Sequence, residues 1–552
     1  MKNRYHLFFY LMFINYLIFI STNLAQDFDW AKNAGGISED IGYSISTDAS
    51  GNSYLIGSFK ETASFGIIQL VSYGNSDIFI AKYNKNGSCL WVKKAGGISD
   101  DIGRDIFIDA NGNIYVTGFF KENATFGNIQ LTSYGDWDIF IAKYDTIGNC
   151  IWAKGAGTVI EDFGTGISAD SDGYSYLTGS FKGIATFGTI QIVGYGGSDV
   201  FIAKYDPNGN CVWVKKAGGG SIDEGAGIST DPEGNSYITG YFGYAGVFGT
   251  IQLVSYGYSD IYIAKYDSTG NCMWAKNAGG SLNDYGLNVS IDTDGNSYIT
   301  GNFEDEATFG TTQLISYGFI DMFIAKYDSD GNFLWAKNGG GNSSAGGNSI
   351  STDMKGNSYV IGNFGGTANF GTIQLTSIGS YDIFIAKYDS GGNCIWAENA
   401  GGTFNDLGYG ISTSSVGNNY ITGIFEDSAT FGTIPLNSFG AYDIFIATIS
   451  STSSSIEPQS LYLIPSEMQL YQNYPNPFNP LTRIQYSVNS TQNVMLKVYD
   501  LLGKEVATLV NEEKPTGEYK VEFSGEGLPS GIYFSQLKAG SFVETKKMIL
   551  LK

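Results

Sequence analysis

Seven tryptophans recur at one fixed interval, and this spacing constrains the fold more than any other feature of the sequence. They are Trp30, Trp91, Trp152, Trp213, Trp274, Trp335 and Trp396, each 61 residues after the last. A second series keeps the same interval: Asp77, Asp138, Asp199, Asp260, Asp321, Asp382 and Asp443. No copy has gained or lost a residue in these columns. Such a period is typical of repeat architectures, in which small similar units pack on their neighbours.

Each copy predicts four β-strands and no helix. In the first copy the strands are expected at 43–48, 53–59 and 77–83, followed by a fourth strand of the type "CIWAKNA". The segment "FGIIQLVS" between the second and third strands adds at most a short piece. Turns of the form Asp-x-x-Gly-Asn join the first two and the last two strands, as Asp and Gly suit such turns. The turns also resemble fragments of calcium loops, but they lack the distal Glu, so a turn role is favoured.

The strands are apolar on both faces, so each sheet needs a cover on both sides. Four-stranded sheets packed between two others are the blades of a propeller. The sequence begins its repeats with a lone fourth strand, "FDWAKNA", and ends them with a third strand at 443–449. Pairing these two would remove an open sheet edge. We therefore expect an all-β fold whose main part, residues 26–450, is a seven-bladed β-propeller closed by the N-terminal strand.

The repeats resemble a known family. The phrases "GNSYITG", "DIFIAKYDSxGNCxWAK" and "AGG" are similar to the bacterial β-propeller repeat family called SBBP, over roughly residues 27–450. The resemblance implies a fold and not a reaction.

A different composition follows a Ser-rich linker at 451–462. Residues 463–552 alternate apolar residues with turn signals, which predicts a small Ig-like β-sandwich. The segments "LYQNYPNPFNPLTRIQYSV", "VYDLLGKEVATLV", "GLPSGIYFSQLKAG" and "KKMILLK" are similar, in this order, to the C-terminal sorting domain of type IX secretion. That resemblance implies the type IX machinery as a partner and a location outside a Gram-negative cell, secreted or on the outer cell surface.

The first 25 residues are typical of a signal peptide. Lys2 and Arg4 precede the apolar run at 7–20, and we expect cleavage between Ala25 and Gln26. His6, the only histidine, lies in this segment. The mature chain would then lack Ser-His-Asp and Cys-His catalysis and every His-based metal site. No later stretch is long enough for a transmembrane helix.

Composition restricts the partners further. The net charge is −23, and the excess of acid lies in the repeats, because basic and acidic residues cancel in the tail. An acidic surface repels nucleic acid, so no nucleic-acid partner is expected, although solubility alone also explains the acidity. We expect a monomer. Five cysteines share one repeat column with two phenylalanines, which predicts buried free thiols rather than disulfides.

Two acidic columns are the candidate polar sites. The Asp77 series precedes the third strand and is expected to cap backbone N–H groups. The second series lies in a more variable loop, with Ala345 in the odd copy, and is the better candidate for a ligand face, with calcium as a candidate ion and no other cofactor expected. Its members are Asp40, Asp101, Asp162, Asp223, Asp284 and Asp406.

Two classes of function remain. Uniform blades and missing catalytic residue types favour an exported, non-catalytic propeller that acts as a binding, adhesion or interaction scaffold for a glycan or a surface protein. The alternative is a secreted hydrolase or lyase that acts on polysaccharide through a pair of carboxylates, for example among Glu304, Asp305 and Glu306. The aromatic side chains at the repeat positions of Tyr54 and Phe59 are expected to pack between blades rather than to stack on sugars.

Overall fold

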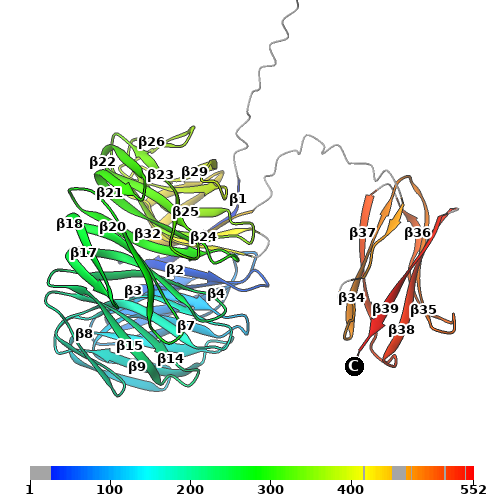
Figure 1. Cartoon of the computed structure of the whole chain (residues 1–552), viewed down its shortest axis with the longest axis horizontal. Helices are drawn as coiled ribbons and strands as arrows, with labels where there is room; N and C mark the ends of the chain where they lie inside the picture. Colours follow the sequence, from blue (N-terminus) through cyan, green and yellow to red (C-terminus); the bar gives the residue numbers. More distant parts are fainter. Residues whose placement is uncertain are drawn as a thin grey trace, which may run out of the picture. The chain divides into compact units, whose positions relative to one another are not determined.

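The computed structural model describes residues 27–414, 417–450, 468–473, 475–514, 517–540 and 542–551. All regular structure in these ranges is β-strand. The chain divides into two compact units, Met1–Ser453 and Ser454–Lys552 (Figure 1). The predicted signal peptide and linker lie outside the described residues.

Each repeat supplies four strand positions, which pair antiparallel in the order innermost, second, third and outer. The innermost strands are β2 (Ile41–Thr47), β6 (Asp101–Ile108), β10 (Phe163–Ala169), β16 (Glu224–Thr230), β20 (Asp284–Ile291), β24 (Ala345–Thr352) and β30 (Leu407–Thr413). The outer strands are β1 (Phe28–Gly36), β5 (Cys89–Gly97), β9 (Cys150–Gly157), β15 (Cys211–Gly219), β19 (Cys272–Ala278), β23 (Phe333–Gly341) and β29 (Cys394–Gly402).

The middle of each sheet holds the second and third positions. The second strands are β3 (Ser53–Phe65), β7 (Ile114–Phe126), β11 (Ser175–Phe181) with β12 (Ile184–Phe187), β17 (Ser236–Phe248), β21 (Ser297–Phe309), β25 (Ser358–Phe364) with β26 (Thr367–Phe370), and β31 (Asn419–Phe431). The third strands are β4 (Ile68–Tyr83), β8 (Ile129–Tyr144), β13 (Ile190–Val193) with β14 (Asp199–Tyr205), β18 (Ile251–Tyr266), β22 (Thr312–Tyr327), β27 (Ile373–Thr376) with β28 (Asp382–Tyr388), and β32 (Ile434–Ile449).

The hairpin between the second and third strands is longer than the sequence indicated. β3 continues past Phe59 to Phe65, and Gly66, at φ +63°, begins the tight turn into β4. The extension reaches the outer strand of the preceding repeat, where Gly36 pairs with Ala63. A Cβ on Gly36 would lie 2.0 Å from the Thr62 carbonyl oxygen, so this close approach requires glycine. The extension therefore links neighbouring repeats by backbone pairing.

The tryptophan column also joins one repeat to the next. The indole N–H of Trp30 donates to the Lys85 carbonyl oxygen at 3.0 Å, in a turn of the following repeat. That turn packs so tightly on the ring that a Cβ on Gly87 would meet Trp30 at 2.7 Å. The 61-residue interval is thus fixed by contacts between repeats as well as within them.

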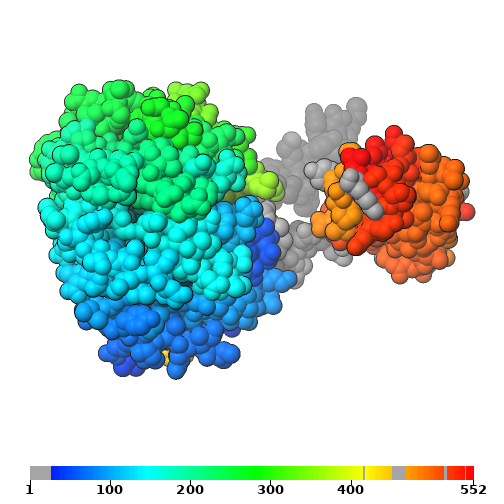
Figure 2. Space-filling model, turned by 90° about the horizontal axis from the view of Figure 1, so that it is seen from below, coloured from blue at the N-terminus to red at the C-terminus, as the bar shows by residue number. Residues whose placement is uncertain are grey.

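The two ends of the repeat series meet. β1 pairs with β32 from Phe28 opposite Ile449 to Ala34 opposite Ile444. The innermost strands contact one another in chain order, and β30 also contacts β2. Figure 2 shows successive repeats side by side, from blue through cyan to green.

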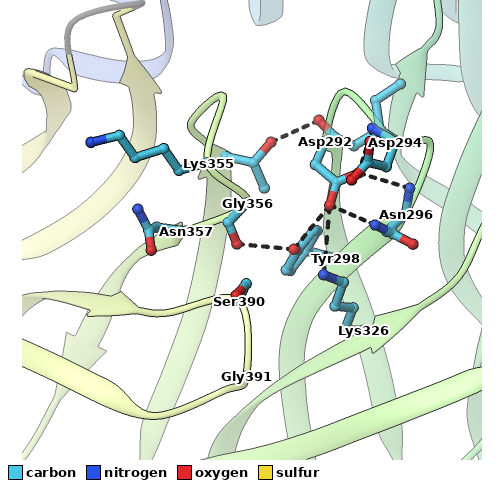
Figure 3. A network of polar contacts seen from close by, with 12 residues as sticks. Asp292, Asp294, Asn296, Tyr298, Lys326, Lys355, Gly356, Asn357, Ser390 and Gly391 are labelled. Carbon is cyan, nitrogen blue, oxygen red and sulfur yellow. Dashed lines mark hydrogen bonds and ion pairs between the residues drawn. The ribbon is translucent and has the colours of Figure 1, made fainter.

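The Asp-x-x-Gly-Asn turns behave as predicted. Asp292 accepts hydrogen bonds from the Asn296 amide at 2.8 Å and the Tyr298 hydroxyl at 3.1 Å, and it forms an ion pair with the Lys326 ammonium at 3.6 Å (Figure 3). Tyr298 also donates to the Gly356 carbonyl oxygen of the next repeat at 2.9 Å. The turn carboxylates therefore stabilise their own turns and, through Tyr298, the contact with the next repeat.

The five cysteines are free thiols, as expected, but they are half-buried rather than buried. Each lies against the apolar core of its sheet, and Cys89 Sγ lies 3.6 Å from the Trp91 carbonyl oxygen. Burial raises the pKa of Cys89 to about 11, so these thiols stay protonated at neutral pH.

The second unit contains two antiparallel sheets around one apolar cluster. The first sheet has the order β33 (Gln469–Leu470), β34 (Leu481–Val488) and β37 (Gly517–Ser524). The second has the order β36 (Glu505–Lys514), β35 (Gln492–Asp500), β38 (Gly531–Ala539) and β39 (Phe542–Leu550). Ile484, Val498 and Leu537 are fully buried between them.

Candidate functional site

Each innermost strand carries a β-bulge at the same repeat position. In β2, Gly42 pairs with Gly57 and Ser44 with Ile56, so Tyr43 has no partner across the strand. The other six innermost strands shift register at the equivalent residue. A bulge re-aims the side chain of its extra residue. The bulge column is Tyr43, Arg104, Thr165, Ala226, Leu287, Asn348 and Tyr409.

An invariant glycine precedes every bulge. A Cβ on Gly42 would lie 2.5 Å from Thr422 Oγ1, and one on Gly103 would lie 2.4 Å from Ile56 Cγ1. Thr422 lies in β31 and Ile56 in β3, both second strands of a neighbouring repeat, so glycine lets each innermost strand pack closely on that second strand. The close approach fixes the backbone on which the bulge residue stands.

All seven bulge residues line one cavity of about 570 Å³, here called the inner-strand cavity. Every innermost strand contributes to it, and Tyr241 of β17 joins them. The remaining polar lining comes from neighbours of the bulge: Ser44, Asp105, Glu224, Asn288 and Ser349. The volume lies within the range of small-ligand pockets.

Aromatic and cationic groups meet on one side of this cavity. Tyr43 stacks on Tyr409 with ring centroids 5.9 Å apart and an interplanar angle of 28°. The Arg104 guanidinium carbon lies 4.5 Å from the centre of the Tyr43 ring. Cation–π contact of this kind holds a guanidinium in place without neutralising it.

The two acids of the cavity are already engaged. Asp105 accepts hydrogen bonds from the Ser44 hydroxyl at 2.7 Å and from the Ile106 and Ile167 N–H groups at 2.9 and 2.8 Å. Burial raises its pKa to about 6, against the lowering effect of these donors and of Arg104. Burial first, and then the charge and hydrogen bond of Glu224, raise the pKa of Tyr241 well above its ordinary value.

The predicted ligand-face aspartates lie elsewhere. All six are fully buried: Asp40, Asp101, Asp162, Asp223, Asp284 and Asp406. In the first repeat, Asp40 accepts the Gly36 N–H at 2.6 Å and the Lys60 N–H at 3.1 Å. Their carboxylates therefore organise the loop backbone, and a role in ligand contact stays a prediction. No cluster of three or more candidate metal-binding side chains occurs within the described ranges.

The Asp77 series caps the hairpin, as predicted, and meets the Asp40 series. Asp443 accepts the Phe439 N–H at 2.6 Å through Oδ2, whereas its buried Oδ1 has no hydrogen-bond partner. A Cβ on Gly35 would lie 2.5 Å from that Oδ1 and 2.9 Å from Asp40 Oδ2, so the two carboxyls face each other across the glycine. Burial first, and then the charge of Asp443, raise the pKa of Asp40 to about 7.

Such acid pairs recur between repeats, with one exception. The charge of Asp77 acts on Asp101, and burial with that charge raises the pKa of Asp101 to about 8. Asp321 has Ala345 where the second acid would stand. The sequence shows both the Asp77 series and the Asp40 series, but it does not show that their carboxyls face each other.

The other candidates from sequence lie outside the cavity lining. Glu304, Asp305 and Glu306 belong to the β21 hairpin, where Asp305 has a φ of +57° and Glu306 bonds Gln313. Tyr54 and Phe59 are buried in the core, as expected. Among the described residues, no helix is long and apolar enough to cross a membrane.

Comparison with known protein families finds a matching family model in each of the two parts of the chain. Residues 472–551 match the model of the secretion system C-terminal sorting domain. Residues 90–118 and 212–241 match the model of the β-propeller repeat. The chain carries β-propeller repeats and a type IX sorting domain. It is therefore a protein that Gram-negative bacteria of the Bacteroidetes type secrete or display on the outer cell surface.

Individual relatives are distant. An uncharacterized WD repeat-containing protein of Acanthamoeba polyphaga mimivirus is 25% identical over 440 residues, which span 62% of this chain and 32% of the relative. The regulatory protein FlaEY of Caulobacter vibrioides is 23% identical over 256 residues, 43% of this chain and 25% of the relative. The chain thus matches about a third or less of either protein. A crystal structure of a puromycin hydrolase mutant has a TM-score of 0.36 at 10% identity, over 81% of this chain and 58% of the other.

Proposed function

We propose that this protein is a secreted, non-catalytic β-propeller that binds a ligand in the inner-strand cavity. The observation that carries the proposal is the bulge column. The Gly42 column is glycine in all seven repeats and the Ile45 column is Ile or Val, whereas the bulge column between them holds six different residue types, all of which line one cavity. Columns that keep one residue type stabilise the scaffold. A column that brings a different side chain to each side of one cavity suits recognition of an asymmetric ligand.

The proposal includes a closed ring of seven blades. The pairing of β1 with β32 and the contact between β30 and β2 support closure. We propose the limits given by the sequence: a signal peptide at 1–25, the propeller at 26–450, a linker at 451–462 and an Ig-like sorting domain at 463–552. Monomeric binding to a glycan or a surface protein, with the type IX machinery as the export partner, completes the proposal.

A polysaccharide hydrolase or lyase is the second candidate, because Asp105 and Glu224 line the same cavity. Catalysis by paired carboxylates needs one acid and one free base. Asp105 already accepts three hydrogen bonds and Glu224 binds Tyr241, and this favours binding over catalysis.

One experiment separates the two. The purified protein is applied to an array of glycans and polysaccharides with calcium present, and each bound ligand is then checked for cleavage. Binding without cleavage is expected, and shortened ligand would instead establish the enzyme. Ala226→Trp fills the cavity and should abolish binding, whereas Leu90→Trp, on the half-exposed outer strand β5, should not. Equal binding by both variants would place the ligand outside the cavity.

A further inference from the structure

Arg104 is the one arginine of the repeats, and it stands in the inner-strand cavity. Its guanidinium lies over Tyr43, but no hydrogen bond or ion pair joins it to any residue that the structure describes. A guanidinium carries five N–H donors in a rigid fork. A fork that is positioned by an aromatic ring and left without acceptors is ready for an acceptor from outside.

The neighbouring acids do not fill this role. Asp105 is the nearest candidate, since the charge of Arg104 lowers its pKa, yet its oxygens accept the Ser44 hydroxyl and two backbone N–H groups. Glu224 accepts the Tyr241 hydroxyl. The cavity therefore combines one uncommitted cation with the Asp105 carboxylate, which already accepts three hydrogen bonds, and the Glu224 carboxylate, which contacts Tyr241.

We infer that the cavity binds a carboxylate-bearing saccharide of the uronic acid type, with Arg104 bound to the carboxylate. Guanidinium and carboxylate match in a bidentate geometry that is stronger than a neutral hydrogen bond. Asp105 and Glu224 keep the cavity acidic, so a singly charged carboxylate is tolerated better than a doubly charged phosphate. This inference rests on the proposed binding function and specifies its ligand class.

The rest of the lining suits a sugar. The stacked pair of Tyr43 and Tyr409 offers an apolar platform for the C–H face of a pyranose ring. Asn288, Asn348 and Ser349 bring amide and hydroxyl groups to the same cavity for the sugar hydroxyls. Asn348 already donates to the Gly408 carbonyl oxygen at 2.8 Å, which fixes its amide and leaves its oxygen as an acceptor.

The test compares trigalacturonate with one probe that keeps the sugar without the charge and one that keeps the carboxylate without the sugar. Trigalacturonate, its methyl ester and acetate are titrated into the full chain by calorimetry at low and high salt. Trigalacturonate should bind at least about tenfold more tightly than its methyl ester, because a charged hydrogen-bonded pair contributes this much. It should also bind more tightly than acetate, which keeps the carboxylate but lacks the sugar contacts. Its affinity should fall as salt rises.

Variants separate this inference from the proposed function. Arg104→Gln should reduce the affinity for trigalacturonate about 10-fold to 100-fold and leave the methyl ester unaffected, with Arg104→Lys in between. Arg483→Gln, in the sorting domain, removes the only other arginine of the mature chain and should change nothing. Thermal melting checks that each variant is folded.

Two results overturn the inference. Trigalacturonate that fails to bind at millimolar concentration, or that binds no better than its ester and ignores Arg104→Gln, excludes an acidic saccharide at Arg104. If neutral ligands from the array still bind and Ala226→Trp abolishes that binding, the proposed function survives. If nothing in the array depends on Ala226, both fail together.

Discussion

The buried acid pairs predict a pH-dependent stability that one substitution can isolate. The sixth repeat has Asp321 but carries Ala345 where the second acid stands in the others. Ala345 is 2% exposed, and the equivalent Asp40 accepts two backbone N–H groups. Ala345→Asp would complete the seventh pair, and Ala345→Asn would supply nearly the same shape without the charge.

The magnitude follows from the existing pairs. Burial first, and then the charge of the facing acid, raise the pKa of Asp40, Asp284 and Asp406 to about 7, from an ordinary value of 3.8. A shift of about three units corresponds to about 4 kcal/mol. Since the pKa is raised in the folded state, the carboxyl does not reduce the free energy of unfolding below pH 3.8. That free energy falls as pH rises from 3.8 through about 7, and it levels off above the folded pKa. The Asp variant should therefore be about 4 kcal/mol less stable than the Asn variant at pH 8 and less than about 2 kcal/mol less stable at pH 5.

The assay is urea unfolding of the two variants, followed by tryptophan fluorescence between pH 5 and 9. All eight tryptophans lie in the repeats, so the signal reports this unit and not the sorting domain. Comparison of the two variants at each pH cancels the titration of every other group. Parallel stability curves across this range would refute the idea that facing carboxyls resist ionisation in this fold.

Three further predictions test other parts of the structure. Removal of β1, Phe28–Gly36, leaves the β32 edge unpaired and should lower the melting temperature far more than removal of an exposed loop of equal length; an unchanged melt would contradict closure. A chain without Leu463–Lys552 should stay in the periplasm, and its appearance in the medium would contradict the sorting role. Thiol titration should find five thiols after denaturation, with or without reductant, and slow reaction in the native state because burial raises their pKa to about 11 or 12; a count that rises with reductant would indicate disulfides.

The scaffold could be predicted from sequence because its determinants repeat. The column of Trp30 holds the same residue type seven times over, so chance substitutions do not hide it. The strand limits were less accurate where pairing between repeats decides them: β3 runs to Phe65 because its extension pairs with Gly35 and Gly36 of β1, which alternation within one repeat does not show. The half-burial of Cys89 likewise depends on how neighbouring strands cover it.

The contacts between columns could not be predicted. Asp40 and Asp443 lie at opposite ends of the repeat series, yet their carboxyls face each other across Gly35. In a periodic sequence the spacing between any two columns is the same in every repeat, and this constant spacing carries no information on which columns meet in space. The acidic loop column was therefore interpreted as a candidate ligand face, and the structure adds that its carboxylates are buried.

The sequence does contain a signal for the candidate site, but that signal can be interpreted only when the fold is known. Between the invariant Gly42 column and the apolar Ile45 column, position 43 varies from Tyr to Arg to Ala. Variation in a repeat ordinarily marks an exposed position without a constraint. Here the bulge places that position in one cavity shared by seven strands, and under the proposed function the seven residues act together on a single ligand. In the proposed ring of near-identical blades, residues that differ at the shared cavity are the means by which an otherwise symmetric scaffold would hold an asymmetric molecule in one orientation.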